Sequence, residues 1–423
     1  MLKVLFKYLI LFFIVLSFGS KAFAQVLLDS VCSSQIKTIQ LYKEGWEMSP
    51  PIITLGSDER IRIAFDDMNN LAKNYCYTII HCNSEWQSSE LLYSEFADGF
   101  EQNQIASPAF STNTMVNYIH YSFVLPNENF KPIISGNYIV KVFENFDTSK
   151  LVFTKRFYIT ENTASVILNI LRPEIARYMM KYQQFKVYIK PNVDDFTDLR
   201  SEIKTKIVQN FNQTTLRNCY LSRLEENNLI YDDLDSNLFE AGNEFRNFDI
   251  KSVRYQSPRI QSSTFTDNMR LITLYPDEWR NRKQYFSDVD LNGKYYVANS
   301  MGVKKEVDAD YNKVHITLPT KDPVLEGGFY VLGALTNWQC NALSQMKYNF
   351  RTHAYEIDLF LKQGYYNYQF VYNDLFMNKL DFAYVEGNHY ETENDYCVFV
   401  YYKQVSARYE RLIGVQMANS IKK

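Results

Sequence analysis

Hydrophobic and polar residues alternate along most of this chain, with the period of two that indicates β-strands buried on one face. In residues 60–65, Ile61, Ile63 and Phe65 share one face of such a strand. The segments KVHITLP (313–319) and GYYNYQFVY (364–372) repeat the pattern. Pro, Gly, Asn or Asp residues bound these runs, as they do at strand ends. The pattern predicts an all-β protein.

Turn signals recur about every ten residues, which is the usual spacing in β-sandwiches. They divide the chain into three predicted blocks. Residues 25–162 are predicted to form an Ig-like or fibronectin-like sandwich, residues 163–302 a middle β domain with long Asn- and Asp-rich loops, and residues 303–423 another antiparallel sandwich. The sequence shows no repeat of fixed period. We therefore expect a multi-domain chain of consecutive sandwiches.

The first 24 residues have the layout of a secretory signal peptide. Lys3 and Lys7 precede the apolar run YLILFFIVLSF (8–18), and Ala22 and Ala24 occupy the small-residue positions before a cleavage site. The apolar run is shorter than the roughly 20 residues that a membrane-spanning helix needs. We expect export with cleavage after Ala24 and no direct insertion into a membrane.

The charge balance excludes two classes of partner. The chain has 45 basic and 48 acidic residues, a net charge of −3, and no long run of either sign. It therefore lacks the basic stripe of a nucleic-acid-binding protein and the polybasic patch of a membrane-surface protein. The 33 Tyr and 30 Phe residues instead suit half-buried strands and protein interfaces.

Six cysteines occur without any C-x-x-C pair. They are Cys32, Cys76, Cys82, Cys219, Cys340 and Cys397. An oxidising compartment permits disulfides, but the sequence leaves their pairing open. We expect most of them to be buried free thiols, which pack as small hydrophobic groups, and Cys340 with Cys397 is the pair worth testing.

No catalytic, metal or cofactor motif is found. The five histidines do not have metal-ligand spacing, and no nucleophile elbow or phosphate-binding glycine loop occurs. In AGNEFRNFD (241–249), Glu244, Arg246 and Asp249 are predicted to pair at a solvated strand end. We expect no catalytic residue, no metal and no cofactor, so an enzyme has no positive support.

The segment GGFYVLGALTNWQ (327–339) resembles the opening of starch- and glycogen-binding β-sandwich modules. The resemblance continues over residues 328–388 and implies that sandwich type. Trp338 would supply a flat ring for a sugar, with Asn337 and Gln339 beside it. In the alternative interpretation Trp338 closes the end of the sandwich against Tyr355 or Tyr368. A carbohydrate-binding or glycan-processing envelope protein is therefore the alternative function.

A wider resemblance covers nearly the whole chain after residue 24. The segments LYKEGWEMSPPIITLGSDERIRIAFDDM (41–68), YCYTIIHCNSEWQSSELLYSEFADGF (75–100) and VEGNHYETENDYCVFVYY (385–402) resemble the type IX secretion system plug proteins of Bacteroidetes, in the same order. The resemblance implies a periplasmic, non-catalytic protein that binds the giant outer-membrane β-barrel translocon. It also implies that the protein seals the periplasmic opening when no cargo is present.

The family has no motif that marks its contact residues. Trp46, Trp86 and Tyr93 are candidate partner contacts because aromatic residues are dense around them. Trp338 is a candidate contact for a partner or a glycan. Packing in the core is the alternative role of each of these side chains.

Overall fold

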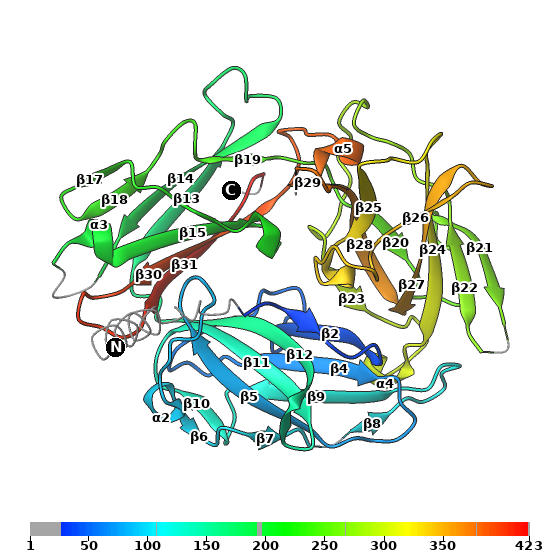
Figure 1. The fold of residues 1–423 in the computed structure, drawn as a ribbon, viewed down its shortest axis with the longest axis horizontal. Coiled ribbons are helices and arrows are strands. Elements are labelled where there is room, and N and C mark those ends of the chain that lie inside the picture. Colours follow the sequence, from blue (N-terminus) through cyan, green and yellow to red (C-terminus); the bar gives the residue numbers. More distant parts are fainter. Residues whose placement is uncertain (1–26, 107, 193–196, 267, 378, 422–423) are drawn as a thin grey trace, which may run out of the picture.

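The computed structural model describes residues 27–421, except 107, 193–196, 267 and 378. The predicted signal peptide and its cleavage after Ala24 lie outside the described residues. The described chain folds into three β lobes that meet at a common centre (Figure 1). Within the described residues, no helix is long and apolar enough to span a bilayer.

The first lobe comprises residues 27–162. A sheet in the order β1-β12-β11-β5-β7, with β3 paired to β12, faces a second sheet in the order β2-β4-β9-β8. Its elements are β1 (Ser30–Val31), β2 (Ile36–Lys43), β3 (Ile52–Thr54), β4 (Ile61–Asp67), β5 (Tyr75–Cys82), α2 (Tyr93–Phe96), β6 (Ala97–Gly99), β7 (Asn103–Gln104), β8 (Ala109–Phe110), β9 (Ile119–Leu125), β10 (Phe130–Pro132), β11 (Gly136–Glu144) and β12 (Asp147–Thr160).

The second lobe comprises residues 163–241 and 394–421. One sheet has the order β13-β14-β18-β17, with β19 paired to β14, and the other has the order β16-β15-β30-β31. Its elements are β13 (Ser165–Leu171), β14 (Tyr182–Lys190), α3 (Leu199–Glu202), β15 (Ile203–Gln209), the 3-10 helix η1 (Gln213–Thr215), β16 (Arg217–Asn218), β17 (Arg223–Glu225), β18 (Asn228–Tyr231), β19 (Leu238–Glu240), β30 (Asp395–Tyr402) and β31 (Arg411–Asn419).

The third lobe comprises residues 242–393. One sheet has the order β20-β28-β23, with β25 and β29 also paired to β28, and the other has the order β21-β22-β24-β27-β26. Its elements are β20 (Arg246–Asp249), β21 (Ile260–Phe265), β22 (Arg270–Leu274), β23 (Tyr295–Val297), α4 (Lys305–Asp308), β24 (Tyr311–Pro319), β25 (Gly327–Leu332), the 3-10 helix η2 (Ala334–Thr336), β26 (Lys347–Asn349), β27 (Ala354–Lys362), β28 (Gly364–Asp374), β29 (Lys379–Asp381) and α5 (Ala383–Glu386).

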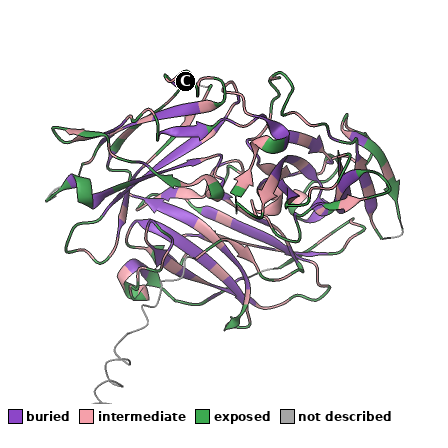
Figure 2. Cartoon of the chain, turned by 45° about the horizontal axis from the view of Figure 1, so that its top comes forward, coloured by how far each residue is buried: buried purple, intermediate pink, exposed green. Residues whose placement is uncertain are grey.

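Each lobe has its own hydrophobic core between two sheets, so the predicted all-β, multi-domain sandwich fold is confirmed. Buried positions follow the strands, and exposed residues concentrate in the loops (Figure 2). Ile61, Ile63 and Phe65 are all fully buried in the first core, as their alternation predicts. In the third core Tyr366, Tyr368 and Phe370 of β28 are buried on one face in the same way.

The strand pairing departs from the predicted boundary between residues 302 and 303. β30, which the sequence placed in the last block, pairs with β15 of the second lobe from Ile203–Tyr402 to Gln209–Tyr396. β20, which the sequence placed in the middle block, pairs with β28 of the third lobe. The alternation of a strand shows which face is buried but does not identify its partner strand, and long connections can return a strand to an earlier sheet.

Candidate functional site

A cavity of about 420 Å³ lies where the three lobes meet. The first lobe lines it with β2, the loop at residues 47–51 and β12, the second with the turn between β15 and η1, and the third with β23 and the segment after η2. Its volume lies in the range of roughly 300–1,000 Å³ that is typical of small-molecule sites. No single lobe forms this cavity, so it exists only in the assembled chain.

Aromatic rings from all three lobes line the cavity. Tyr158 comes from β12, Phe211 from the turn after β15, Tyr295 from β23 and Trp338 from the segment after η2. Trp338 is half-buried and packs edge-on against Phe245, with the ring centroids 5.9 Å apart. Its ring leaves no room for a side chain at Gly293, because a Cβ there would lie 2.4 Å from Trp338 Cη2.

Two of the aromatic side chains are carried by strained backbone. Asn210 and Phe211 have φ values of 53° and 52°, and Asn337 and Trp338 have φ values of 53° and 55°. Asparagine adopts this left-handed conformation readily, whereas Phe and Trp rarely do. Each such residue costs on the order of 1–3 kcal/mol, and strain of this kind concentrates at functional sites.

The lining carries three cations and two acids. Lys155 Nζ lies 2.6 Å from Asn337 Oδ1 and 3.3 Å from Asp29 Oδ2. Lys294 Nζ lies 3.2 Å from the Met48 carbonyl and 3.6 Å from Asp395 Oδ2.

Arg156 is held differently. Its Nε and Nη2 donate to the Leu27 carbonyl at 3.0 and 2.6 Å. Its guanidinium lies 4.4 Å above the centroid of the Trp86 ring. Within the described chain no carboxylate forms an ion pair with it, and burial lowers the pKa of Arg156. Asp29 accepts from the Arg156 backbone NH at 2.9 Å, so the cavity contains a half-buried guanidinium with an acid nearby but no direct ion pair.

The four predicted contact residues are not brought together. Trp46 is 57% exposed, whereas Trp86 is 3% exposed and packs between the first and second lobes. Tyr93 begins the short helix α2 and packs against the first core, and burial raises the pKa of its phenol to about 12. Trp338 lines the central cavity and packs against Phe245 rather than against Tyr355 or Tyr368.

All six cysteines are free, so the Cys340–Cys397 pair does not form. Cys340 lies in the third lobe and Cys397 in β30 of the second. Burial raises the pKa of Cys340 to about 11 and that of Cys82 to about 12. These thiols are protonated at neutral pH and make poor nucleophiles.

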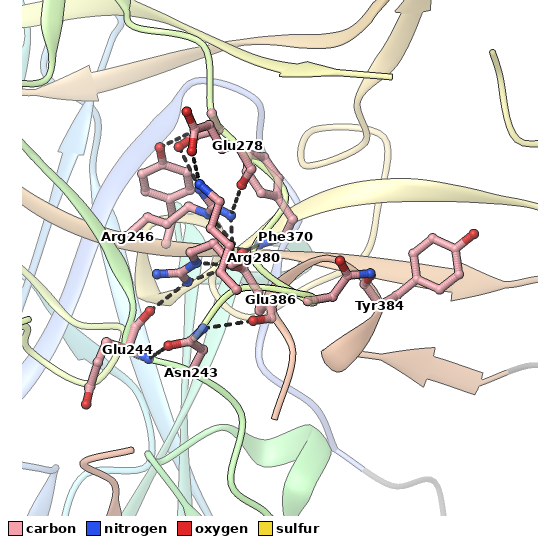
Figure 3. Close-up of polar contacts among 12 residues, drawn as sticks. Asn243, Glu244, Arg246, Glu278, Arg280, Phe370, Tyr384 and Glu386 are labelled. Carbon is pink, nitrogen blue, oxygen red and sulfur yellow. Dashed lines mark hydrogen bonds and ion pairs between the residues drawn. The ribbon is translucent and has the colours of Figure 1, made fainter. Parts of the chain in front are cut away.

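A buried ion cluster in the third lobe contains the arginine of the predicted Glu244–Arg246–Asp249 group, but with other partners (Figure 3). Arg246 donates to Glu386 Oε1 and Oε2 at 3.0 and 2.9 Å and to Asp277 Oδ1 at 2.9 Å. Glu386 also accepts from Arg280 and from the Phe370 backbone NH. Arg280 and Arg259 complete the neutralisation of these two acids, and the cluster ties β20, β28 and α5 together.

The remaining candidates for a metal or catalytic site are the acidic side chains, the cysteines and the histidines. Among the described residues, no group of three or more His, Cys, Asp or Glu side chains is placed to hold a metal ion. His81 and His120 are hydrogen-bonded in the first lobe, His81 to Ser89 and Ser135 and His120 to Asp66.

Of the residues that line the cavity, only Trp338 and its neighbours Asn337 and Gln339 could be predicted from the sequence as candidate contacts. Lys155, Arg156, Phe211 and Lys294 lie on segments that are far apart in the chain. One local signal was available, because an asparagine directly precedes both Phe211 and Trp338. Asparagine favours left-handed turns.

Comparison with known proteins connects the first lobe to a family. Residues 36–161 match the family model described as the type 9 secretion system plug protein first domain. A crystal structure of a hypothetical protein from Parabacteroides merdae is 31% identical, with a TM-score of 0.90, and the match covers 93% of this chain and 100% of that chain.

Two further comparisons add nothing to the fold or the family. The alkylpurine DNA glycosylase AlkC of Pseudomonas fluorescens, bound to DNA with an abasic site analog, is 15% identical over 30% of each chain. Its TM-score of 0.18 does not indicate a shared fold. No curated protein matches the chain.

Proposed function

This chain belongs to the type 9 secretion system plug protein family, and on that premise we propose that it binds the outer-membrane β-barrel translocon of that system and closes its periplasmic opening while no cargo passes. The match of residues 36–161 to the plug domain carries the proposal. We place the protein in the periplasm, reached through the predicted signal peptide. We assign it a binding role without catalysis.

The packing between the lobes supports this role, because a body that closes a wide opening must not flex apart. Tyr158 of the first lobe stacks on Phe399 of the second, with ring centroids 4.4 Å apart. Lys362 of the third lobe forms a buried ion pair with Asp66 of the first at 2.7 Å. Apolar and ionic contacts thus join the first lobe to both others.

Among the residues predicted to contact a partner, Trp46 is accessible on the surface of the folded chain. It is 57% exposed and lies in the part of the chain that matches the plug domain. Exposed tryptophans are enriched among the residues that dominate protein interfaces. We therefore propose Trp46 as one contact with the translocon, whereas Trp86 is buried between lobes and cannot serve as one without unfolding.

Affinity capture tests the proposal. An epitope-tagged chain is expressed in the cells that produce it, and the envelope is solubilised in mild detergent and purified on the tag. We expect a very large outer-membrane protein to be recovered in stoichiometric amount. Recovery of the tagged chain without such a protein would refute the proposal.

Two variants refine the capture. Trp46→Ala should reduce recovery of the partner, whereas Phe350→Ala, which removes an exposed aromatic side chain of the third lobe, should not.

In cells that lack the gene we expect small-molecule leakage across the outer membrane to rise. Leakage equal to that of wild-type cells would contradict the closing role even if binding is observed.

A further inference from the structure

We propose that the cavity where the three lobes meet binds an anionic sugar, namely a pyranose that carries a carboxylate or a phosphate. The proposal goes beyond closure of the translocon and does not depend on it. Three features of the lining carry it: the aromatic rings, the hydrogen-bonding amides and the Arg156 guanidinium, which forms no direct ion pair with a described residue.

The rings provide the surface for the sugar body. A pyranose presents a face of C–H groups that packs against an aromatic ring, and such weak contacts add to apolar burial. Phe211 and Trp338 reach the cavity from different lobes, each on the second residue of a left-handed pair.

Each pair forms the centre of a hydrogen-bonded turn, because the Asn212 NH donates to the Gln209 carbonyl at 3.0 Å and the Gln339 NH donates to the Thr336 carbonyl at 3.2 Å. The described residues contain one other left-handed pair in which an aromatic residue follows an asparagine, Asn145–Phe146. That pair connects β11 to β12 as a two-residue turn, where left-handed residues are required. Asn210–Phe211 leads into η1, and Asn337–Trp338 follows η2. In these two turns the aromatic residue follows the asparagine and its ring lines the cavity.

Amides beside the rings are free to bind hydroxyl groups. The Asn337 side-chain oxygen accepts from Lys155 at 2.6 Å, and no described residue accepts from its NH₂ group. The Gln40 side chain also lines the cavity and has no hydrogen bond to a described residue. Amides both donate and accept, so they match sugar hydroxyls.

The charge of the lining favours an anion over a neutral sugar. The Arg156 guanidinium is occupied by the Leu27 carbonyl and a 3.5 Å contact to Gln213 Oε1, which leaves donors on Nη1 and Nη2 unused. Lys294 is only weakly paired, at 3.6 Å from Asp395. Of the two acids in the lining, Asp29 is paired with Lys155 and Glu47 with Lys305. Arginine binds carboxylate and phosphate groups through two parallel hydrogen bonds.

Calorimetric titration tests the proposal on the purified chain without its first 24 residues. The probes are digalacturonate, glucose 6-phosphate and the neutral disaccharide maltose. We expect one or both anionic sugars to bind and maltose to bind at least about tenfold more weakly, because charge-assisted hydrogen bonds to Arg156 are lost. The two anionic probes distinguish a carboxylate ligand from a phosphate ligand.

Four variants locate the binding. Arg156→Gln should weaken binding of the anionic sugar by about tenfold, and Trp338→Leu should weaken it comparably through loss of ring contact. Arg177→Gln and Phe350→Leu, at exposed positions outside the cavity, should leave the affinity unchanged. If Arg156→Gln does not fold, Lys294→Gln tests the other weakly paired cation of the lining.

Three outcomes would overturn the proposal. They are the absence of heat with every probe at millimolar concentration, equal affinity for maltose and the anionic sugars, and unchanged affinity in both the charge variant and Trp338→Leu. None of these outcomes affects the capture experiment, so sugar binding and translocon binding are tested independently.

Discussion

His81 shows how burial sets the chemistry of a single side chain. It is 1% exposed, with Nδ1 2.8 Å from Ser89 Oγ and Nε2 3.2 Å from the Ser135 carbonyl. Burial lowers the pKa of its imidazole to about 4, because a charged ring would lose its hydration. The folded chain therefore keeps His81 neutral at neutral pH, and its role is structural.

We expect His81 to make the fold sensitive to mild acid. The pKa of His81 is about 4 in the folded chain and 6.5 in the unfolded chain. Between these pH values the unfolded chain binds a proton at His81 and the folded chain does not. The stabilisation is complete above pH 6.5 and is lost as the pH falls toward 4, by about 3 kcal/mol in total.

Urea unfolding at pH 7 and pH 4.5 measures this loss. His81→Gln should lose less stability over the window than the wild type. Ser89→Ala keeps the imidazole and should keep the wild-type dependence on pH. Equal dependence in the wild type and His81→Gln would show that another group titrates instead.

At the scale of elements, the return of β30 and β31 to the second lobe matters most. β30 pairs with β15 on one side and with β31 on the other. Five residues of this segment, Tyr396, Val398, Val400, Tyr402 and Ile413, belong to the second core. The second lobe therefore cannot complete its core before the whole third lobe has been synthesised.

Fragments test this dependence. A fragment of residues 27–302 lacks β30 and β31, and we expect its second lobe to remain unfolded because β15 is left as an edge over an open core. A fragment of residues 27–161 should unfold cooperatively, since every residue of the first core lies within it. Amide exchange compares the two, and protection of β14 and β15 in the longer fragment would contradict the expectation.

For the whole molecule, the buried ion pair Asp66–Lys362 joins the first and third lobes. The two side chains are 1% and 2% exposed. Tyr311 donates to Asp66 at 2.7 Å, and His120 Nδ1 lies 2.7 Å from its other oxygen. Burial alone would raise the pKa of Asp66, but the Lys362 ammonium holds it below the ordinary value. The pair therefore links the first lobe to the third through a buried contact.

We expect Lys362→Met to destabilise the chain by about 3–5 kcal/mol, because it removes the ammonium paired with the buried Asp66 carboxylate and leaves only the His120 imidazole beside it. Lys43→Met is the matched control, since its partner Glu59 and Lys43 itself are both about one-third exposed, and exposed pairs contribute at most about 1 kcal/mol. Chemical denaturation measures both variants. Similar losses of unfolding free energy in the two variants would show that the interlobe pair stabilises the chain no more than an exposed pair does.

Parts of the fold and of the cavity could be predicted from particular residues. The alternation of Ile61, Ile63 and Phe65 identified a buried face, because the period of two is a local property. The placement of Trp86 between lobes and the pairing of Arg246 with Glu386 could not be predicted. Residues 246 and 386 are separated by most of the third lobe, and alternation says nothing about contacts at that distance.

The sequence by itself determined the all-β class and the resemblance to the plug proteins. These depend on local alternation and on the residues and order of particular segments, which are present in the chain before it folds. The tertiary structure alone decided that β30 returns to β15, that Asp66 meets Lys362, and that Arg156, Phe211 and Trp338 line one cavity. Such contacts arise from burial shared between distant strands, and only the folded chain brings those strands together.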